Sequence, residues 1–176
     1  MDDIFYIIGQ VLGIIAIFLG LVNYQMRTQR QILFVQIATA AVFCIHYLLI
    51  GATSGMAMNF VNIIRNLAYD YRNRTGKGGL VIPIAFTALQ LAMGILTWEA
   101  WYSVFLLVGI ATNTFCMSFS KPQNVRKSIL VTSPLVLTYD LFAKSIGGAI
   151  YETVALVSAF VGIIRNRKKQ NELDAE

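Results

Sequence analysis

The sequence predicts an all-α integral membrane protein, because its composition, its hydrophobic runs and the placement of its basic residues all favour that class. The 176 residues are 57% hydrophobic and only 13% charged, with a mean hydropathy of +0.64. A soluble domain of this size buries roughly 70% of its unfolded-chain surface, so this chain would leave large apolar patches in water. The composition also excludes a disordered chain and a disulfide-rich secreted scaffold.

Seven apolar runs, each bounded by a turn or by charges, predict seven helices. Their lengths of roughly 15 to 21 residues lie at or a little below the ~20 residues that cross a bilayer core. Strands are a poor alternative, because barrel strands alternate apolar and polar residues whereas Ile14–Leu19 is apolar throughout. We expect the spans at residues 4–24, 31–50, 56–70, 80–97, 101–119, 128–143 and 149–166.

The basic residues predict the orientation of these spans. All lysines and arginines except Lys144 end or follow the first, third, fifth and seventh runs, so they would share one side of the membrane. By the positive-inside rule that side is cytoplasmic, which places the N-terminus outside and the C-terminus inside. The net charge of +5 is then a determinant of topology, and we expect no nucleic-acid partner. The acidic Asp2 and Asp3 also differ from the basic start of a signal peptide.

An internal repeat relates the two halves of the chain. Residues 60–66 read FVNIIRN and residues 160–166 read FVGIIRN, and the basic turns at 29–33 and 126–130 also match. The first three spans therefore resemble the last three, and the fourth span returns the chain so that both triplets run in the same direction. We expect two parallel three-helix bundles joined by a linker helix. The predicted parts are a first bundle at 1–72, a loop and linker helix at 73–99, a second bundle at 100–167 and a charged cytoplasmic tail at 168–176.

Three stretches carry a resemblance to a known family. They are His46–Ala52 (HYLLIGA), Asn62–Arg65 (NIIR), and Ser145–Gly148 (SIGG) followed by Glu152 and Ile163–Arg165. These motifs resemble the YgjV family of bacterial inner-membrane proteins, and the 3+1+3 layout resembles the wider superfamily of SWEET, PQ-loop and nicotinamide-riboside (PnuC) transporters. The resemblance implies a location in the inner membrane and, by analogy of fold, transport of a small solute.

The PQ-loop part of this resemblance is present in one repeat. Pro122-Gln123 is similar to the PQ-loop signature at the cytoplasmic end of a helix. The first repeat has Thr28-Gln29 near the matching position and lacks the proline.

Polar residues at membrane depth are the candidate site residues, because a charge near the bilayer centre costs at least ~2.5 kcal/mol. Alignment on the turns at Gly55 and Gly148 pairs Asn59 with Glu152 across the pseudo-twofold axis. The resemblance implies that polar residues on the third helix of each triplet line the substrate cavity, so we expect Asn59 and Glu152 to bind solute. Glu152 follows the Gly147-Gly148 turn by only four residues, so a shallow position in contact with water stays open for it.

A second alignment of the repeats gives a further pair of candidates. The seven extra residues in the second repeat are close to two helical turns, so they preserve the face of the helix and shift its depth. This register makes Asn62 and Ser158 candidate binding residues. Both asparagines are equally compatible with hydrogen bonds that only join helices.

The remaining polar candidates have two interpretations each. His46 is either a solute ligand or a hydrogen-bond partner between helices, and Asp140 either contacts solute or pairs with Lys144 at i, i+4. Arg65 either anchors its span at the cytoplasmic headgroups or acts as an internal gate, as does Arg165 in the second repeat. Pro134 would kink the sixth span and assist gating.

Other chemistry has little support in the sequence. One histidine and two cysteines cannot form a four-ligand zinc site without carboxylates from distant spans, so we expect neither metal nor cofactor. Cys44 and Cys116 should differ in depth by more than the ~7 Å limit for a disulfide, and we expect free thiols. The chain has no Walker motif and no nucleophile elbow. We expect no enzymatic activity.

The sequence thus predicts a small polar-solute transporter or facilitator of the cytoplasmic membrane, with a central site between two bundles that alternate access. A non-transporting sensor, receptor-like protein or assembly partner on the same fold stays open, as does a membrane enzyme acting through Glu152 or His46. The expected partners are a small solute and the lipid bilayer, and a homo-oligomer is compatible with the sequence. The mixture of amide, imidazole and carboxylate groups favours a neutral or cationic solute over an anion.

Overall fold

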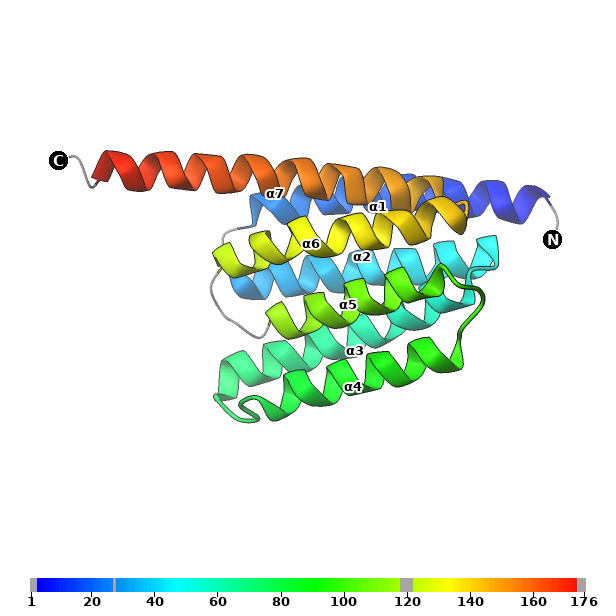
Figure 1. Ribbon diagram of the computed structural model, residues 1–176, viewed down its shortest axis with the longest axis horizontal. Helices are drawn as coiled ribbons and strands as arrows, with labels where there is room; N and C mark the ends of the chain where they lie inside the picture. Colours follow the sequence, from blue (N-terminus) through cyan, green and yellow to red (C-terminus); the bar gives the residue numbers. More distant parts are fainter. Residues whose placement is uncertain (1–2, 27, 118–121, 174–176) are drawn as a thin grey trace.

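The computed structural model describes residues 3–26, 28–117 and 122–173, and within these ranges the chain forms seven α-helices, as predicted (Figure 1). The helices lie roughly parallel and antiparallel in one bundle, and the N-terminus and C-terminus lie at opposite ends of it. Their bounds are α1 Asp3–Gln25, α2 Gln29–Ile50, α3 Thr53–Thr75, α4 Val81–Leu96, α5 Ser103–Met117, α6 Pro122–Phe142 and α7 Ile146–Leu173. We call the end where α1, α3, α5 and α7 begin the N-terminal end, and the other the basic end.

The helices differ from the expected runs mainly where they continue into polar sequence. Helix α3 extends to Thr75 and ends at Gly76, whose φ of 69° is a left-handed conformation that suits glycine. Helix α7 extends to Leu173, so part of the charged segment that we expected as a tail is helical. Residues 118–121, which end the expected fifth span, lie outside the described residues. Hydrophobic runs mark the buried length of a helix in lipid, whereas hydrogen bonds and caps determine where it ends.

Six of the helices form a ring. Helices α1, α2, α3, α5, α6 and α7 pack in that cyclic order, and α7 closes the ring against α1. Helix α3 meets α5 only loosely, and α4 packs against both of them outside the ring at this seam. The ring therefore has one direct closure and one closure that a seventh helix covers.

A backbone contact between glycines makes the direct closure. Gly13 of α1 lies against Gly147 of α7, and a Cβ atom added to Gly13 would approach the Gly147 Cα to 2.8 Å. Only glycine permits this distance, because any side chain would push the helix backbones apart. Next to this contact, Gln10 hydrogen-bonds the backbone at Lys144 and Ile146.

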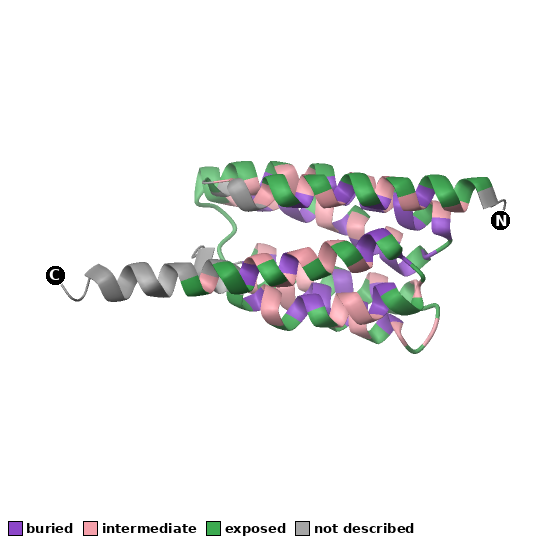
Figure 2. Ribbon diagram, turned by 90° about the horizontal axis from the view of Figure 1, so that it is seen from above, coloured by how far each residue is buried: buried purple, intermediate pink, exposed green. Residues whose placement is uncertain are grey.

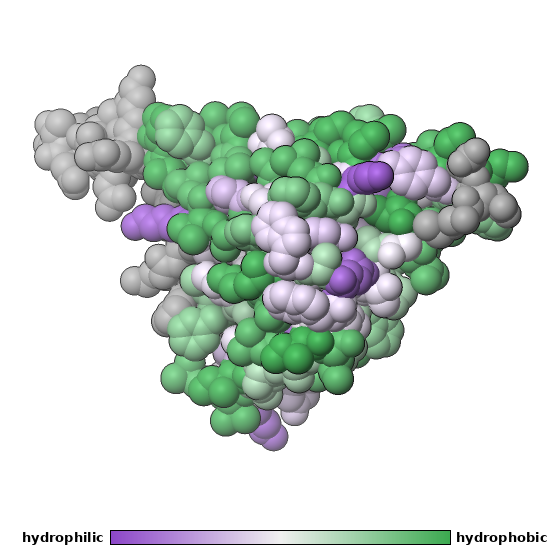
Figure 3. Space-filling view, turned by 45° about the vertical axis from the view of Figure 1, so that its right-hand side comes forward, coloured by the Kyte–Doolittle hydropathy of each residue, from purple (hydrophilic) through white to green (hydrophobic). Residues whose placement is uncertain are grey.

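The polarity of the bundle is inverted relative to a soluble protein. Large apolar side chains such as Phe18, Leu48 and Val157 are exposed on the outer faces, while His46 and Asp140 are completely buried. Figure 2 shows the exposed residues on outward-facing sides of the helices, and Figure 3 shows a surface that is mostly hydrophobic. Water would penalise such a surface, whereas lipid is a suitable solvent for it.

Length and composition alone make two of the described helices long and apolar enough to cross a membrane, at Ile4–Asn23 and Arg30–Ile50. Three shorter helical stretches are also apolar: Val81–Leu96, Ser103–Met117 and Ile146–Val161.

Candidate polar cavity

A cavity of about 150 Å³ lies at the centre of the ring. All six ring helices contribute to its wall, and α4 does not. An engineered apolar cavity of about this size holds one benzene molecule, so the space suits a solute of roughly six to ten heavy atoms. Its polar lining residues are Asn23, Gln36, Thr39, Tyr47, Asn59, Asn62, Arg65, Asn66, Asn113, Thr132, Ser133, Asp140, Tyr151 and Glu152.

Several polar atoms in this wall have no hydrogen-bond partner. Among the described residues, the buried unpartnered side-chain atoms of the lining are Asn23 Oδ1, Gln36 Oε1, Asn66 Nδ2, Asn113 Oδ1 and Asp140 Oδ2. A buried polar atom without a partner costs about 1–3 kcal/mol, so a folded protein rarely retains several in one place. Their convergence on one cavity indicates that the cavity holds polar molecules, water or solute, that complete these hydrogen bonds.

Two carboxylates lie in the half of the cavity toward the N-terminal end. The Tyr47 hydroxyl donates a hydrogen bond of 2.5 Å to Asp140 Oδ1, and Ser133 hydrogen-bonds to Glu152. No basic side chain lies within 4 Å of either carboxylate among the described residues. Lys144 in particular does not pair with Asp140: α6 ends at Phe142, and Lys144 adopts a φ of 55° in the turn that follows. The i, i+4 ion pair with Lys144, which was one of the two interpretations of Asp140, is therefore absent.

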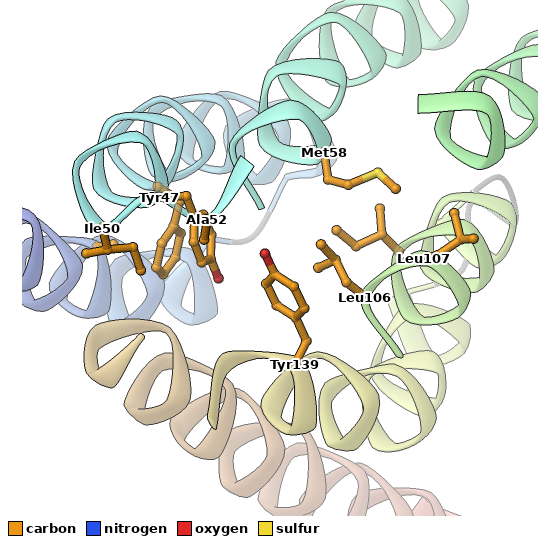
Figure 4. Close-up of a cluster of buried hydrophobic side chains, with 10 residues drawn as sticks. Tyr47, Ile50, Ala52, Met58, Leu106, Leu107 and Tyr139 are labelled. Carbon is orange, nitrogen blue, oxygen red and sulfur yellow. The ribbon is translucent and has the colours of Figure 1, made fainter. Parts of the chain in front are cut away.

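An aromatic cluster covers this end of the cavity. Tyr47 and Tyr139 are fully buried and converge from α2 and α6, with Met58, Leu106 and Leu107 packed nearby (Figure 4). The Tyr139 hydroxyl accepts a hydrogen bond of 2.9 Å from the Gly55 backbone N–H, which joins α6 to α3. With the Tyr47–Asp140 bond, these contacts join the three helices at the N-terminal end of the ring.

Arg65 lies deeper in the cavity wall and is only 3% exposed. Its Nη1 donates to Thr114 Oγ1 at 2.7 Å, and its Nε and Nη2 both donate to Asn66 Oδ1. The Thr114 hydroxyl donates in turn to Gln90 Oε1, and Gln90 Nε2 donates to Asn62 Oδ1 at 2.8 Å. This chain of hydrogen bonds crosses α3, α5 and α4, so the arginine is held by a built polar network.

Of the two interpretations of Arg65, the anchor at the cytoplasmic headgroups is wrong. An anchoring arginine would extend to the membrane surface and be exposed, whereas Arg65 faces the cavity and hydrogen-bonds to two helices. The side chain of Arg165 lies outside the described residues, as do those of residues 122–126, which include the PQ-like pair, and that of Gly162.

Comparison with known proteins identifies the family. A family model described as bacterial inner membrane protein, Imp-YgjV, matches residues 7–170. The chain belongs to this family. It is similar to the inner membrane protein YgjV of Escherichia coli (strain K12), with 24% identity over 160 residues that cover 91% of this chain and 85% of the relative. No solved structure matches the chain.

This YgjV-family chain is therefore a protein of the bacterial inner membrane, as the motifs predicted. The family match agrees with the inverted polarity of the bundle, in which lipid replaces water around the apolar faces.

The structure brings most of the predicted site residues of this YgjV-family chain to the cavity. Asn59 and Glu152, the pair from the first repeat alignment, both line it, as do Asn62, Arg65 and Asp140. Asn59 Nδ2 also donates to the Gly55 carbonyl of its own helix, at 2.9 Å.

The other three candidates lie away from the cavity. Ser158 does not contribute to its wall, and Pro134 is exposed on the outer face of α6. His46 is fully buried between α1, α2 and the α6–α7 turn: its Nδ1 hydrogen-bonds to the Gly9 carbonyl and its Nε2 to Ser145 Oγ, both at 2.7 Å. A carbonyl only accepts, so Nδ1 carries the proton and the serine hydroxyl donates to Nε2 in the neutral ring. His46 thus joins helices, as its second interpretation proposed.

The sequence analysis missed several polar residues of the cavity, although a signal was present. Gln36, Thr39, Phe43 and Tyr47 recur at helical spacing and line one face of α2. Asn113 lies on α5, one turn from the lining residue Gly109. The polar residues of α2 and Asn113 of α5 are therefore marked in the sequence by their position on a helix face. Most of them are not ionisable, and the candidate sites were drawn mainly from ionisable residues.

Neither of the two cysteines lines the cavity. Cys44 and Cys116 are free thiols, as predicted. Within the described part of the chain, no three His, Cys, Asp or Glu side chains gather closely enough to hold a metal ion.

Proposed function

We propose that this protein is a small-solute transporter or facilitator of the bacterial inner membrane, and that the central cavity is its solute site. The observation that carries the proposal is a polar cavity of about 150 Å³ whose wall comes from all six ring helices of an inner-membrane protein. A membrane protein with only a structural role gains nothing from unpartnered buried polar atoms, because each of them costs stability in lipid.

In this proposal the two halves of the ring are the repeats seen in the sequence. Helices α1–α3 form one bundle, α5–α7 form the other, and α4 links them with the N-terminus outside and the basic end in the cytoplasm. Alternating access requires the bundles to move relative to each other. The Tyr47–Asp140 and Tyr139–Gly55 hydrogen bonds cross between the bundles, so they are contacts that must break when the N-terminal end opens.

Reaction of introduced cysteines with a thiol reagent that cannot cross membranes tests this proposal. In a background with Cys44→Ser and Cys116→Ser, we expect Asn59→Cys and Glu152→Cys to react, because both positions line the cavity. Val157→Cys is the matched control, since Val157 is 60% exposed on the lipid-facing side. The reaction should depend on the side of addition and change when a transported solute is present.

Flux measurements in proteoliposomes complete the test. Vesicles with the protein should exchange at least one class among sugars, nucleosides, amines and amino acids faster than protein-free vesicles. If the two cavity cysteines are as inert as Val157→Cys and no solute class crosses, the transporter proposal is wrong and the non-transporting alternative replaces it.

A further inference from the structure

The geometry of the cavity points to a small zwitterion as its ligand, with the carboxylate of the ligand on Arg65 and its ammonium group on Glu152. This inference rests on the proposed function and adds the class of solute. It departs from the sequence-based preference for neutral or cationic solutes, because that preference rested on amide, imidazole and carboxylate groups and did not count a guanidinium in the cavity wall.

Arg65 provides the anion-binding end of the site. The structure records one acceptor for each of its three nitrogens, which uses three of the five N–H donors of a guanidinium. No carboxylate lies within 4 Å of Arg65 among the described residues. A guanidinium this deeply buried needs an anionic partner, and its planar donors match a carboxylate.

A second donor lies beside the guanidinium. Asn66 accepts hydrogen bonds from Arg65 through Oδ1. Its Nδ2 has no hydrogen-bond partner, and the residue is 0% exposed. Both residues line the cavity. An anion there can therefore accept hydrogen bonds from Arg65 and Asn66 together.

Glu152 provides the cation-binding end, and Asp140 offers further carboxyl oxygens in the same wall. Both carboxylates line the cavity, and neither has a basic partner within 4 Å among the described residues. Asp140 Oδ2 is buried without a hydrogen bond. An ammonium group has three donors and no acceptor, so it matches oxygens of this kind.

Arg65 and Glu152 lie at different depths along the bundle. Helices α3 and α7 begin at the same end of the bundle, and Arg65 lies six positions further along its helix than Glu152 does. At 1.5 Å per residue, six positions correspond to a rise of ~9 Å along a helix axis. A hydrogen bond of roughly 2.8 Å at each charged end of an amino acid accounts for most of that distance.

Ligands with one charge fit the site less well. An anion would leave Glu152 without a counter-charge, and a cation would leave Arg65 without one. A zwitterion compensates both ends and adds no net charge to a site inside the membrane.

Binding measurements with three matched compounds test the inference on the purified full-length protein. The compounds are L-serine, glycerate, which has a hydroxyl in place of the amine, and ethanolamine, which lacks the carboxylate. We expect L-serine at millimolar concentration to raise the thermal midpoint, and the other two compounds to bind roughly tenfold or more weakly. A longer zwitterion, 4-aminobutanoate, is measured in the same way. It should raise the thermal midpoint more than L-serine does if Arg65 and Glu152 lie too far apart for an α-amino acid.

Two charge-neutral variants assign the ends of the ligand. Arg65→Gln should remove the preference for L-serine over ethanolamine, and Glu152→Gln should remove the preference for L-serine over glycerate. Arg65→Lys retains the charge and should keep part of the preference even if Arg65→Gln folds poorly. Thr87→Val is the control, because Thr87 has a buried unpartnered hydroxyl on α4 and lies outside the cavity wall.

The outcomes separate this inference from the transporter proposal. If neither zwitterion binds while a sugar or nucleoside binds and crosses the membrane, the zwitterion inference is wrong and the transporter proposal stands. Equal binding of L-serine and ethanolamine, or a preference that both variants retain, also overturns the inference. If no compound binds and the cavity cysteines are unreactive, both proposals fail.

Discussion

At the scale of single residues, the inside of the bundle depends on a few buried polar contacts. The Tyr47 hydroxyl is the recorded donor to the Asp140 carboxylate, and both residues are almost fully buried. Tyr47→Phe removes this donor and leaves both carboxylate oxygens to be satisfied by other groups. We expect a loss of about 1–3 kcal/mol in the free energy of unfolding, measured by thermal or chemical denaturation in detergent.

The partner substitution separates charge from hydrogen bonding. Asp140→Asn removes the charge and retains an oxygen that can accept from Tyr47, so its loss of stability should be smaller than that of Tyr47→Phe. A large loss for Asp140→Asn beside a small loss for Tyr47→Phe would show that the fold requires the carboxyl group itself, and not the hydrogen bond, at this position. Tyr102→Phe is the control, since the structure records no hydrogen bond from its hydroxyl to another described residue.

His46 gives a second prediction at this scale. It connects the Gly9 carbonyl of α1 with Ser145 in the α6–α7 turn, and it does not line the cavity. His46→Ala should therefore lower stability by about 1–3 kcal/mol, because it leaves buried groups without partners. Among molecules that remain folded, solute affinity should stay close to that of the parent. A selective loss of affinity with unchanged stability would instead assign His46 to the solute site.

Single residues also show what the sequence could not predict. Asn59 and Glu152 were placed at the cavity correctly because a repeat alignment preserves the face of a helix. The place of Arg65 stayed open because it ends a hydrophobic run, and a run cannot show whether its last residue points to the headgroups or back into the bundle. The side chain turns inward because Thr114 and Asn66 offer acceptors there, and Thr114 comes from a helix about 50 residues away.

At the scale of helices, the contact between α1 and α7 is the most sensitive to substitution. Gly13 and Gly147 touch through their backbones, and His46 lies close to Gly13 as well. Gly13→Ala would favour an isolated helix by about 0.5–1 kcal/mol, yet here the new methyl group meets backbone that cannot move aside. We expect a net destabilisation of about 1–3 kcal/mol, measured by thermal denaturation. Val11→Ala, on the lipid-facing side of α1, should change stability much less.

Helix number was predictable and helix packing was not. Seven apolar runs predicted seven helices because each must satisfy its own backbone hydrogen bonds in lipid. The cyclic order of the helices depends on contacts between distant segments, such as Gly13 with Gly147 and Tyr69 with the Thr114 carbonyl. The outward position of α4 also depends on contacts between distant segments. Its Gln90 hydrogen-bonds to Asn62 of α3 and Thr114 of α5, in the network that holds Arg65.

At the scale of the whole molecule, the basic end contains most of the positive charge that the structure describes. Arg30 of α2 and Arg74 of α3 both approach Asp70, at 3.7 and 3.8 Å, and most of the side chain of each arginine is exposed. Surface pairs of this kind contribute little to stability, about 0–1 kcal/mol. Their contribution is to orientation, because arginines and lysines beside a span favour the cytoplasmic side.

This distribution predicts that the basic end is cytoplasmic and that the N-terminus lies outside. Fluorescent-protein fusions after Gly78, in the α3–α4 turn, and after residue 176 should both fluoresce, because each would lie in the cytoplasm. A phosphatase fused after Thr97, at the other end of the bundle, should be active only if that end is outside.

Replacing Arg72, Arg74 and Lys77 with glutamine weakens the positive-charge bias of the α3–α4 loop. The substitution should produce a mixed population with both orientations rather than an unfolded protein. If all three fusions report the opposite sides, the orientation is reversed and the N-terminus is cytoplasmic. The aromatic cluster of Tyr47 and Tyr139 would then lie at the cytoplasmic end of the cavity, and the basic end would lie outside the cell.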